Sequence, residues 1–103
     1  DPVIKLKYLD FSKGKSLSAI TNHLKGDYKL LGINIQKVDR KTINGNRALL
    51  MHGLNPGKNE RFLIGVLVGP DQGYILECVS EADDFNALQG HFRQAIETAR
   101  ILK

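Results

Sequence analysis

The sequence predicts an α+β fold: an α/β/α sandwich, with an antiparallel sheet between a short helix on one face and a long C-terminal helix on the other. Three observations predict it. Apolar residues recur at steps of three and four across residues 83–103, residues 62–68 form an unbroken apolar run, and turn-forming segments separate strand-length stretches. These patterns are typical of an amphipathic helix, a strand covered on both faces, and an antiparallel meander, respectively.

The N-terminal part predicts one strand and one helix. Residues 3–8 alternate between two sides, which indicates a half-buried strand whose lysines face water or guard a sheet edge. One side holds Val3, Lys5 and Lys7, and the other holds Ile4, Leu6 and Tyr8. Ser16 is a typical residue to begin a helix, and we expect this short helix to end near Gly26. Its buried face is predicted to carry Leu17, Ile20 and Leu24.

The middle of the chain predicts strands joined by tight turns. Residues 28–43 are a mixed segment that contains a strand, and Asn44-Gly45 is a strong turn dipeptide because both residues tolerate positive φ. Residues 47–52 complete a hairpin, and Pro56-Gly57 marks the second turn. Residues 61–68 predict a central strand, residues 69–73 the third turn, and residues 74–79 a strand that pairs back.

The last segment predicts the helix that closes the sandwich. Asp83 and Asp84 can cap its first turn. Its apolar stripe consists of Phe85, Leu88, Phe92, Ala95, Ile96, Ala99 and Leu102. We expect Phe92 to be buried against the sheet. Glycine costs about 1 kcal/mol relative to alanine inside a helix, so Gly90 indicates a close approach to the sheet or a kink.

Composition indicates one domain, residues 1–103, with a net charge of +4. Residues 1–58 carry 11 Lys and Arg against 4 Asp and Glu, whereas residues 59–103 carry 4 against 7. This polarity could steer an anionic partner or simply be a solvated surface. Apolar runs stay well below the roughly 20 residues of a membrane span. The single Cys78 excludes an internal disulfide, and we expect it to be a buried thiol.

The sequence offers little catalytic chemistry. His23, His52 and His91 lack the spacing of a metal site. Neither Gly53 and Gly57 nor Gly65 and Gly69 form a phosphate-binding loop, because no Gly-Lys-Ser/Thr follows them. Ser80 lacks the Gly-x-Ser-x-Gly setting of a nucleophile elbow. The carboxylates Glu77, Glu81, Asp83 and Asp84 are expected to end a strand and cap a helix rather than bind a cation, because the spacing of a calcium loop is absent. We therefore expect no enzymatic activity, no cofactor and no metal.

The best candidates for partner binding are basic and aromatic residues of the first strand and the loop after it. They are Lys5, Lys7, Tyr8, Lys13 and Lys15. Such residues can present a sheet edge to a protein partner, which pairs through its backbone and gains specificity from alternate side chains. Nucleic acid is a less favoured partner, since the segment is short and fits no recognition signature.

Several motifs together resemble the PsbP/Mog-like fold. They are Thr42-Ile43-Asn44-Gly45 followed by Ala48, the apolar strand 62–68, Gly73-Tyr74-Ile75-Leu76, and Phe85, Phe92 and Ile96 on the last helix. The resemblance covers residues 3–102, extends to bacterial envelope lipoproteins, and includes a domain that follows the catalytic domain of some secreted zinc metallopeptidases. It implies an α/β/α sandwich whose members mostly bind proteins and share no catalytic residues.

The function we expect is a non-catalytic protein-binding or accessory domain of the bacterial periplasm or cell envelope. The chain begins Asp1-Pro2 rather than with Met, so we expect a processed or excised form that an export signal could have preceded. A cytoplasmic location is the alternative.

Alternative functions are the C-terminal accessory domain of a secreted zinc metallopeptidase and a small-ligand carrier. The carrier would have a pocket lined by Leu50, Phe62, Phe85 and Phe92. The oligomeric state stays open.

Overall fold

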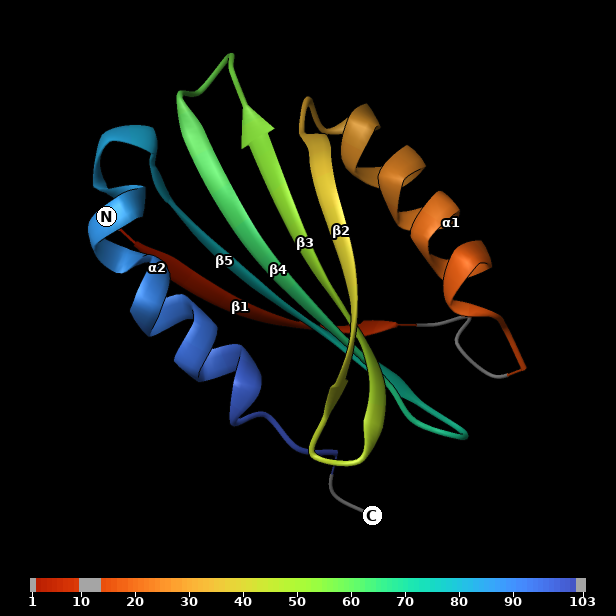
Figure 1. The fold of residues 1–103 in the computed structure, drawn as a ribbon. Helices are drawn as coiled ribbons and strands as arrows, with labels where there is room; N and C mark the ends of the chain where they lie inside the picture. The colour runs from red at the N-terminus through yellow and green to blue at the C-terminus, as the bar shows by residue number, and fades with distance from the viewer. Residues whose placement is uncertain (1, 10–13, 102–103) are drawn as a thin grey trace.

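The computed structural model describes residues 2–9 and 14–101 and confirms the predicted fold class. Its elements are β1 (Val3–Leu9), α1 (Leu17–Leu30), β2 (Asn34–Ile43), β3 (Asn46–Asn55), β4 (Glu60–Val68), β5 (Gly73–Glu81) and α2 (Ala82–Glu97). The five strands form one antiparallel sheet in the order β1-β5-β4-β3-β2. The two helices lie on opposite sides of this sheet (Figure 1).

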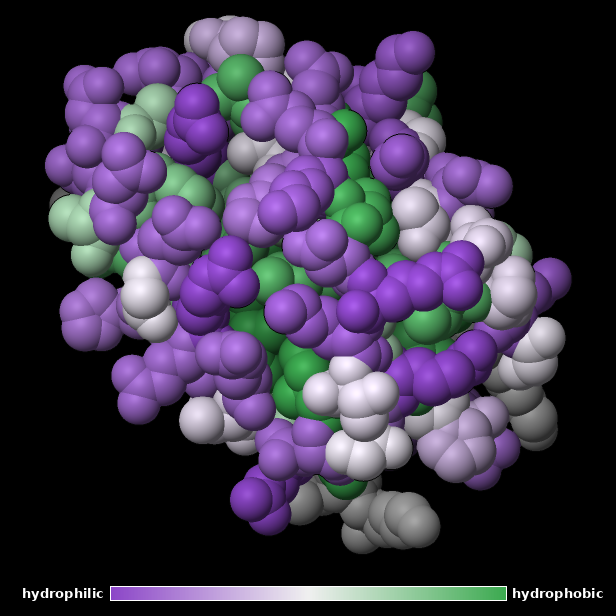
Figure 2. Space-filling view, in the orientation of Figure 1, coloured by the Kyte–Doolittle hydropathy of each residue, from purple (hydrophilic) through white to green (hydrophobic). Residues whose placement is uncertain are grey.

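Strand β4 lies at the centre of the sheet, as the apolar run predicted. Residues 62–68 are all buried, because alternate side chains enter two separate cores. Ile64 belongs to the core beneath α1, whereas Leu63 belongs to the core beneath α2. We call these two faces of the sheet the α1 side and the α2 side. Hydrophilic residues cover most of the surface in the view of Figure 2, with hydrophobic residues visible in the gaps between them.

The two helices cover different halves of the sheet. Helix α1 packs on β2 and β3, whereas α2 packs on β4 and β5. Neither helix has its main contacts on β1, although that strand is paired along its whole length with β5. The first strand therefore has no helix above it on the α2 side. On the α1 side its end is covered, since Leu9 is buried in the core beneath α1.

Helix α1 begins where the sequence predicted but ends later. The Ser16 hydroxyl accepts a hydrogen bond from the backbone N–H of Ala19 at 3.1 Å. The predicted end near Gly26 is wrong, because the helix continues to Leu30 and buries Tyr28. Burying an aromatic side chain outweighs the roughly 1 kcal/mol that an exposed glycine costs within a helix. The chain turns at Gly32 instead, which has a φ of +81°.

Helix α2 differs from its prediction at both ends. Asp83 and Asp84 lie in its first turn, where their charges favour the positive end of the helix, but the cap position is Glu81, with no side-chain capping bond. The helix ends at Glu97, so Ala99 follows it, and Leu102 lies outside the described residues. The stripe is nevertheless confirmed where it matters most for packing, with Phe85, Phe92 and Ile96 buried.

The close approach between α2 and the sheet occurs at a different glycine from the one predicted. A Cβ on Gly90 would meet no atom within 4 Å. A Cβ on Gly65 of β4 would lie 2.9 Å from Cγ1 of Ile96. The glycine that lets the layers meet is therefore in the sheet rather than in the helix.

The β2–β3 turn forms as predicted and also fastens the end of α2. Asn44 and Gly45 have φ values of 49° and 82°. The Asn44 side-chain amide donates to the carbonyl oxygens of Glu97, at 3.3 Å, and Ala99, at 2.8 Å. These bonds hold the chain leaving α2 beside the turn, a proximity visible in Figure 1.

Candidate functional site

Strand β1 forms one edge of the sheet, and its backbone presents a regular, open side. Its register with β5 runs without interruption from Val3 opposite Val79 to Leu9 opposite Gly73. Among the described strands, β5 is its only neighbour. The backbone groups of an edge strand that point away from the sheet can pair with another chain. We call this strand, with its outward backbone groups and side chains, the β1 edge.

The lysine-bearing face of β1 points toward the α1 side, and Lys7 is engaged there. Its Nζ lies 2.8 Å from Oε2 of Glu77, a residue only 6% exposed. The Tyr28 hydroxyl donates to the same oxygen at 2.9 Å, and the Lys7 ammonium lies 5.7 Å from the centroid of the Tyr28 ring. These contacts join β1, β5 and α1 through one buried carboxylate. Lys5, two residues earlier, is exposed as predicted.

Burial determines how the Tyr28 hydroxyl takes part in these contacts. Desolvation, with the Glu77 charge and hydrogen bond adding to it, raises the pKa of Tyr28 well above its ordinary value. The phenol therefore stays protonated and acts as a donor to Glu77 throughout the physiological range. A buried carboxylate with two donors costs far less than an unpaired one, so Lys7 and Tyr28 allow β5 to carry a charge in its interior.

The other face of β1 contradicts the prediction of a half-buried strand with an apolar inner side. Ile4, Leu6 and Tyr8 are 52%, 66% and 75% exposed. They lie opposite Cys78, Leu76 and Tyr74 and thus on the α2 side. The physical reason is the placement of α2, which packs on β4 and β5 and leaves this row of apolar side chains uncovered.

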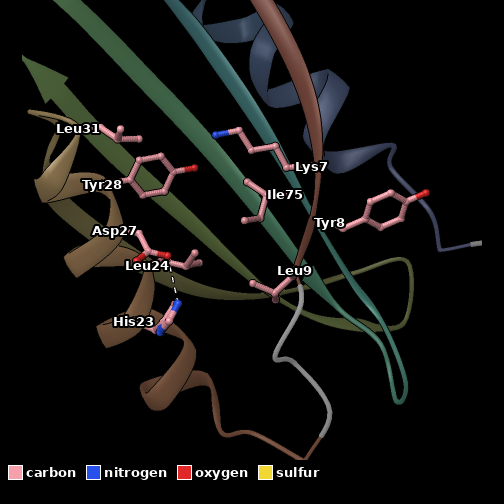
Figure 3. A pocket seen from close by; sticks show the side chains of 9 residues that line it. All are labelled: Lys7, Tyr8, Leu9, His23, Leu24, Asp27, Tyr28, Leu31 and Ile75. Carbon is pink, nitrogen blue, oxygen red and sulfur yellow. Dashed lines mark ion pairs between the residues drawn. The ribbon is translucent and has the colours of Figure 1, made fainter.

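Two hollows open on the α1 side of the β1–β5 part of the sheet, the first beside α1 and the second beyond the C-terminal end of that helix. The first, of about 280 Å³, is shown in Figure 3, where Lys7 and Tyr28 point toward each other and Tyr8 points away to the other side of β1. His23 and Asp27 form an ion pair of 3.1 Å on its helical wall. The second hollow measures about 300 Å³, and its lining includes Lys5, Ile33, Phe62, Glu77 and Val79. Leu31 contributes to both.

The pocket predicted from the aromatic residues does not form. Phe62 points to the α1 side and lines the second hollow. Leu50, Phe85 and Phe92 pack with one another in the core on the α2 side. The sheet separates the two groups because successive residues of a strand face opposite sides.

Of the two remaining sequence candidates, Lys15 lies just before α1 rather than on β1. The Lys15 carbonyl accepts from the guanidinium of Arg47 at 3.3 Å, which ties its backbone to the start of β3 rather than to the lysines of β1. Lys13 lies outside the described residues. The structure therefore unites Lys5, Lys7 and Tyr8 on one strand, with Tyr8 on the opposite face from the two lysines.

Other reactive groups are dispersed in the described part of the chain. No three of its His, Cys, Asp and Glu side chains are close enough together to hold a metal ion. Cys78 is buried, as predicted, and burial raises the pKa of its thiol to about 11. Burial also lowers the pKa of His52, whose Nε2 atom is buried without a hydrogen-bond partner. None of the described helices is long and apolar enough to cross a membrane.

Sequence reasoning missed the roles of Glu77 and Tyr28. A usable signal was present, because Glu77 stands between the apolar residues Leu76 and Cys78 in a predicted strand. A charge in the middle of a buried strand needs a partner, and the alternating lysines of the first strand were available as cross-strand neighbours.

Comparison with known proteins shows the fold. No family model and no curated protein matches the chain. It is similar to the crystal structure of PA94 from Pseudomonas aeruginosa, a protein of unknown function proposed to be a regulator, with a TM-score of 0.72 and 18% identity over 100% of this chain and 85% of that one. It is also similar to the solution structure of CyanoP, the cyanobacterial PsbP of Synechocystis sp. PCC 6803, with a TM-score of 0.69 and 7% identity. That match covers 98% of this chain and 66% of CyanoP, and it shows that the fold is PsbP-like.

Proposed function

We propose that this protein is a non-catalytic protein-binding or accessory domain and that its partner binds at the β1 edge. The observation that carries the proposal is the combination of an uninterrupted open strand with three large apolar side chains in water, Ile4, Leu6 and Tyr8. An exposed, regular, apolar edge strand invites pairing with another chain. In a binding domain, such a strand serves as the contact surface.

The structure also decides which charge reversal can test this proposal. Lys7→Glu would place a second carboxylate beside buried Glu77, so loss of binding by this variant could result from unfolding. Lys5→Glu changes an exposed residue on the same strand. Lys41→Glu makes the same charge change on β2, the opposite edge of the sheet, and serves as the matched control.

The experiment is capture of protein partners from envelope and cytoplasmic extracts with the folded domain as bait. A partner retained by the wild type and by Lys41→Glu, but lost with Lys5→Glu and with Leu6→Asp, supports binding at β1. Circular dichroism and thermal unfolding of each variant verify the fold. A partner retained equally by all four proteins would refute the assignment to this edge.

The two hollows on the α1 side support a second candidate function, a small-ligand carrier. Volumes of about 280 and 300 Å³ are near the lower end of ligand pockets. An apolar anionic dye such as anilinonaphthalene sulfonate is a suitable probe. Leu31→Trp would narrow both hollows, whereas Leu30→Trp, at an exposed neighbour that lines neither, is its control. Dye fluorescence that is unchanged by Leu31→Trp would exclude these hollows as the site.

Two finer parts of the proposal concern context. We propose a location in the bacterial periplasm or cell envelope, with the cytoplasm as the alternative, and fractionation of cells with an antibody against the domain tests it. The accessory domain of a secreted zinc metallopeptidase is the alternative setting. A zinc-binding His-Glu-x-x-His sequence upstream in the complete gene product would support that setting, and a complete product without one would refute it.

A further inference from the structure

We infer that the partner segment at the β1 edge is an extended strand in which apolar and acidic side chains alternate, added to the sheet as a sixth strand. This inference rests on the proposed function, since it specifies the chemistry of what binds there. The apolar side chains of the added strand would lie on the α2 side, beside Ile4, Leu6 and Tyr8, and its acidic side chains would lie on the α1 side, beside Lys5 and Lys7.

Comparison of the two sheet edges shows why β1, rather than β2, is suited to pairing. Helix α2 covers neither strand, so both have a row of side chains open on the α2 side. On β2 that row is charged, with Lys37, Asp39 and Lys41 opposite His52, Leu50 and Ala48. The register of β2 also shifts between Ile35 and Lys37. Charges and irregular register discourage edge pairing, and β1 has neither on its α2 side.

The α2 side of β1 also offers a place for an anchoring side chain. A hollow of about 280 Å³ is lined by Leu6, Tyr8, Tyr74 and Arg100. The rings of Tyr8 and Tyr74 lie 5.4 Å apart and tilted, so they form two adjoining walls. Tyrosine and arginine are enriched among the residues that dominate binding energy at interfaces. An apolar residue of the added strand would lie directly beside this hollow.

Charge determines the other half of the pattern and argues against a second copy of this chain. Lys5 is exposed on the α1 side, and the Lys7 side chain remains 42% exposed despite its bond to Glu77. Acidic side chains at alternate positions of an added strand would meet these two cations. Full antiparallel overlap of two β1 strands would instead place Lys7 of one copy opposite Lys5 of the other, and like charges directly opposite are destabilising.

The test uses seven-residue peptides, the length of β1, blocked at both ends and labelled for fluorescence anisotropy. The probe alternates Leu and Glu, and its control has the same composition with the Leu and Glu residues in separate blocks. We expect the alternating peptide to bind about tenfold or more tightly than the control, because several cross-strand pairs are lost when alternation is broken. Binding should weaken with Leu6→Asp and should be unchanged with Lys41→Glu.

A second pair of peptides tests backbone pairing. Each carries N-methyl groups on alternate backbone nitrogens, in one peptide on the Leu residues and in the other on the Glu residues. For a given strand direction, only one edge of the peptide can face β1 while its acidic side chains meet the lysines, and reversal of the peptide exchanges the two edges. Since antiparallel pairing is slightly more stable per residue than parallel pairing, we expect both peptides to bind more weakly than the unmethylated probe or one of them to keep its affinity while the other loses it. Retention of the full affinity of the unmethylated probe by both peptides would overturn strand addition.

The outcomes separate this inference from the proposed function. If no alternating peptide binds, yet a cellular partner is lost with Lys5→Glu, partner binding at β1 stands and the alternating strand is wrong. Equal binding of the alternating and block peptides also overturns the inference. Sedimentation that shows a dimer abolished by Leu6→Asp would make a second copy the occupant. Binding of lipid vesicles, lost with Leu6→Asp, in place of peptide would make a membrane surface the occupant.

Discussion

Replacement of Gly65 by alanine tests how closely α2 packs on the sheet. The new Cβ would lie 2.9 Å from Cγ1 and 3.2 Å from Cβ of Ile96, against the roughly 3.5–4.0 Å at which carbon atoms attract best. Ile96 is completely buried, so it has little room to move. Overpacking of this kind costs about 1–3 kcal/mol, and each kcal/mol lowers the Tm of a domain this size by about 4–8 °C.

A double-mutant cycle, measured by urea unfolding, isolates this contact. Ile96→Ala alone should cost about 2–5 kcal/mol, because it leaves a cavity. In that background Gly65→Ala should cost less than in the wild type, since the γ carbons of residue 96 are gone and only the contact with its Cβ, at 3.2 Å, remains. Gly90→Ala is the control on the same helix, where nothing lies within 4 Å, and it should stabilise by up to about 1 kcal/mol.

The results for Gly65→Ala and Gly90→Ala can each contradict the packing of α2 described above. If Gly65→Ala is neutral in the wild-type background, or equally costly with and without the Ile96 side chain, the close contact between β4 and α2 is wrong. If Gly90→Ala destabilises instead, that position is packed against something, and the exposed face of α2 has been misplaced.

Three further predictions concern side chains of the core and of the candidate site. Phe92 is only 2% exposed, so Phe92→Ala should lower the free energy of unfolding by about 3–5 kcal/mol. A loss below about 1 kcal/mol, measured by urea unfolding, would show that Phe92 is not part of the core. Lys7→Met should cost about 1–3 kcal/mol through loss of the Glu77 contact, whereas Lys5→Met should be close to neutral, and equal costs would contradict the network. The pKa of Cys78 is raised to about 11 in the folded protein, so its contribution to stability is complete below about pH 9 and is lost as the pH rises toward 11. The free energy of unfolding should therefore fall less between pH 8 and pH 10.5 for Cys78→Ala than for the wild type. Identical decreases in the two proteins would contradict the raised pKa of Cys78.

The sequence predicted the fold well because its signals were local. The apolar run 62–68 needs cover on both faces, Asn44-Gly45 needs a tight turn, and the stripe of the last helix needs a sheet beneath it. The errors came where a tertiary contact overrode a local preference. Gly26 indicated the end of a helix, but burial of Tyr28 carried the helix past it.

The candidate site was predictable only in part. Alternation divided β1 correctly into two faces, but alternation does not say which face a neighbouring layer will cover. That depends on where α2 settles along the sheet, and α2 settles over β4 and β5. The apolar residues Ile4 and Leu6 were therefore expected inside and lie in water, whereas Lys7 was expected in water and meets a buried carboxylate.

The pairing of β1 with β5 also governs the order in which the molecule can assemble. Lys5 and Glu77, which lie opposite each other, are 72 positions apart, whereas β2 to β5 are joined by short turns. Contacts between distant parts of a chain form late because closing a long loop costs entropy. Of the five described strands, β1 is the first to be synthesised, yet it cannot pair until β5, the last of them, has been made. We expect its amides to exchange hydrogen faster than those of β4, and equal protection would show that β1 closes together with the rest of the sheet.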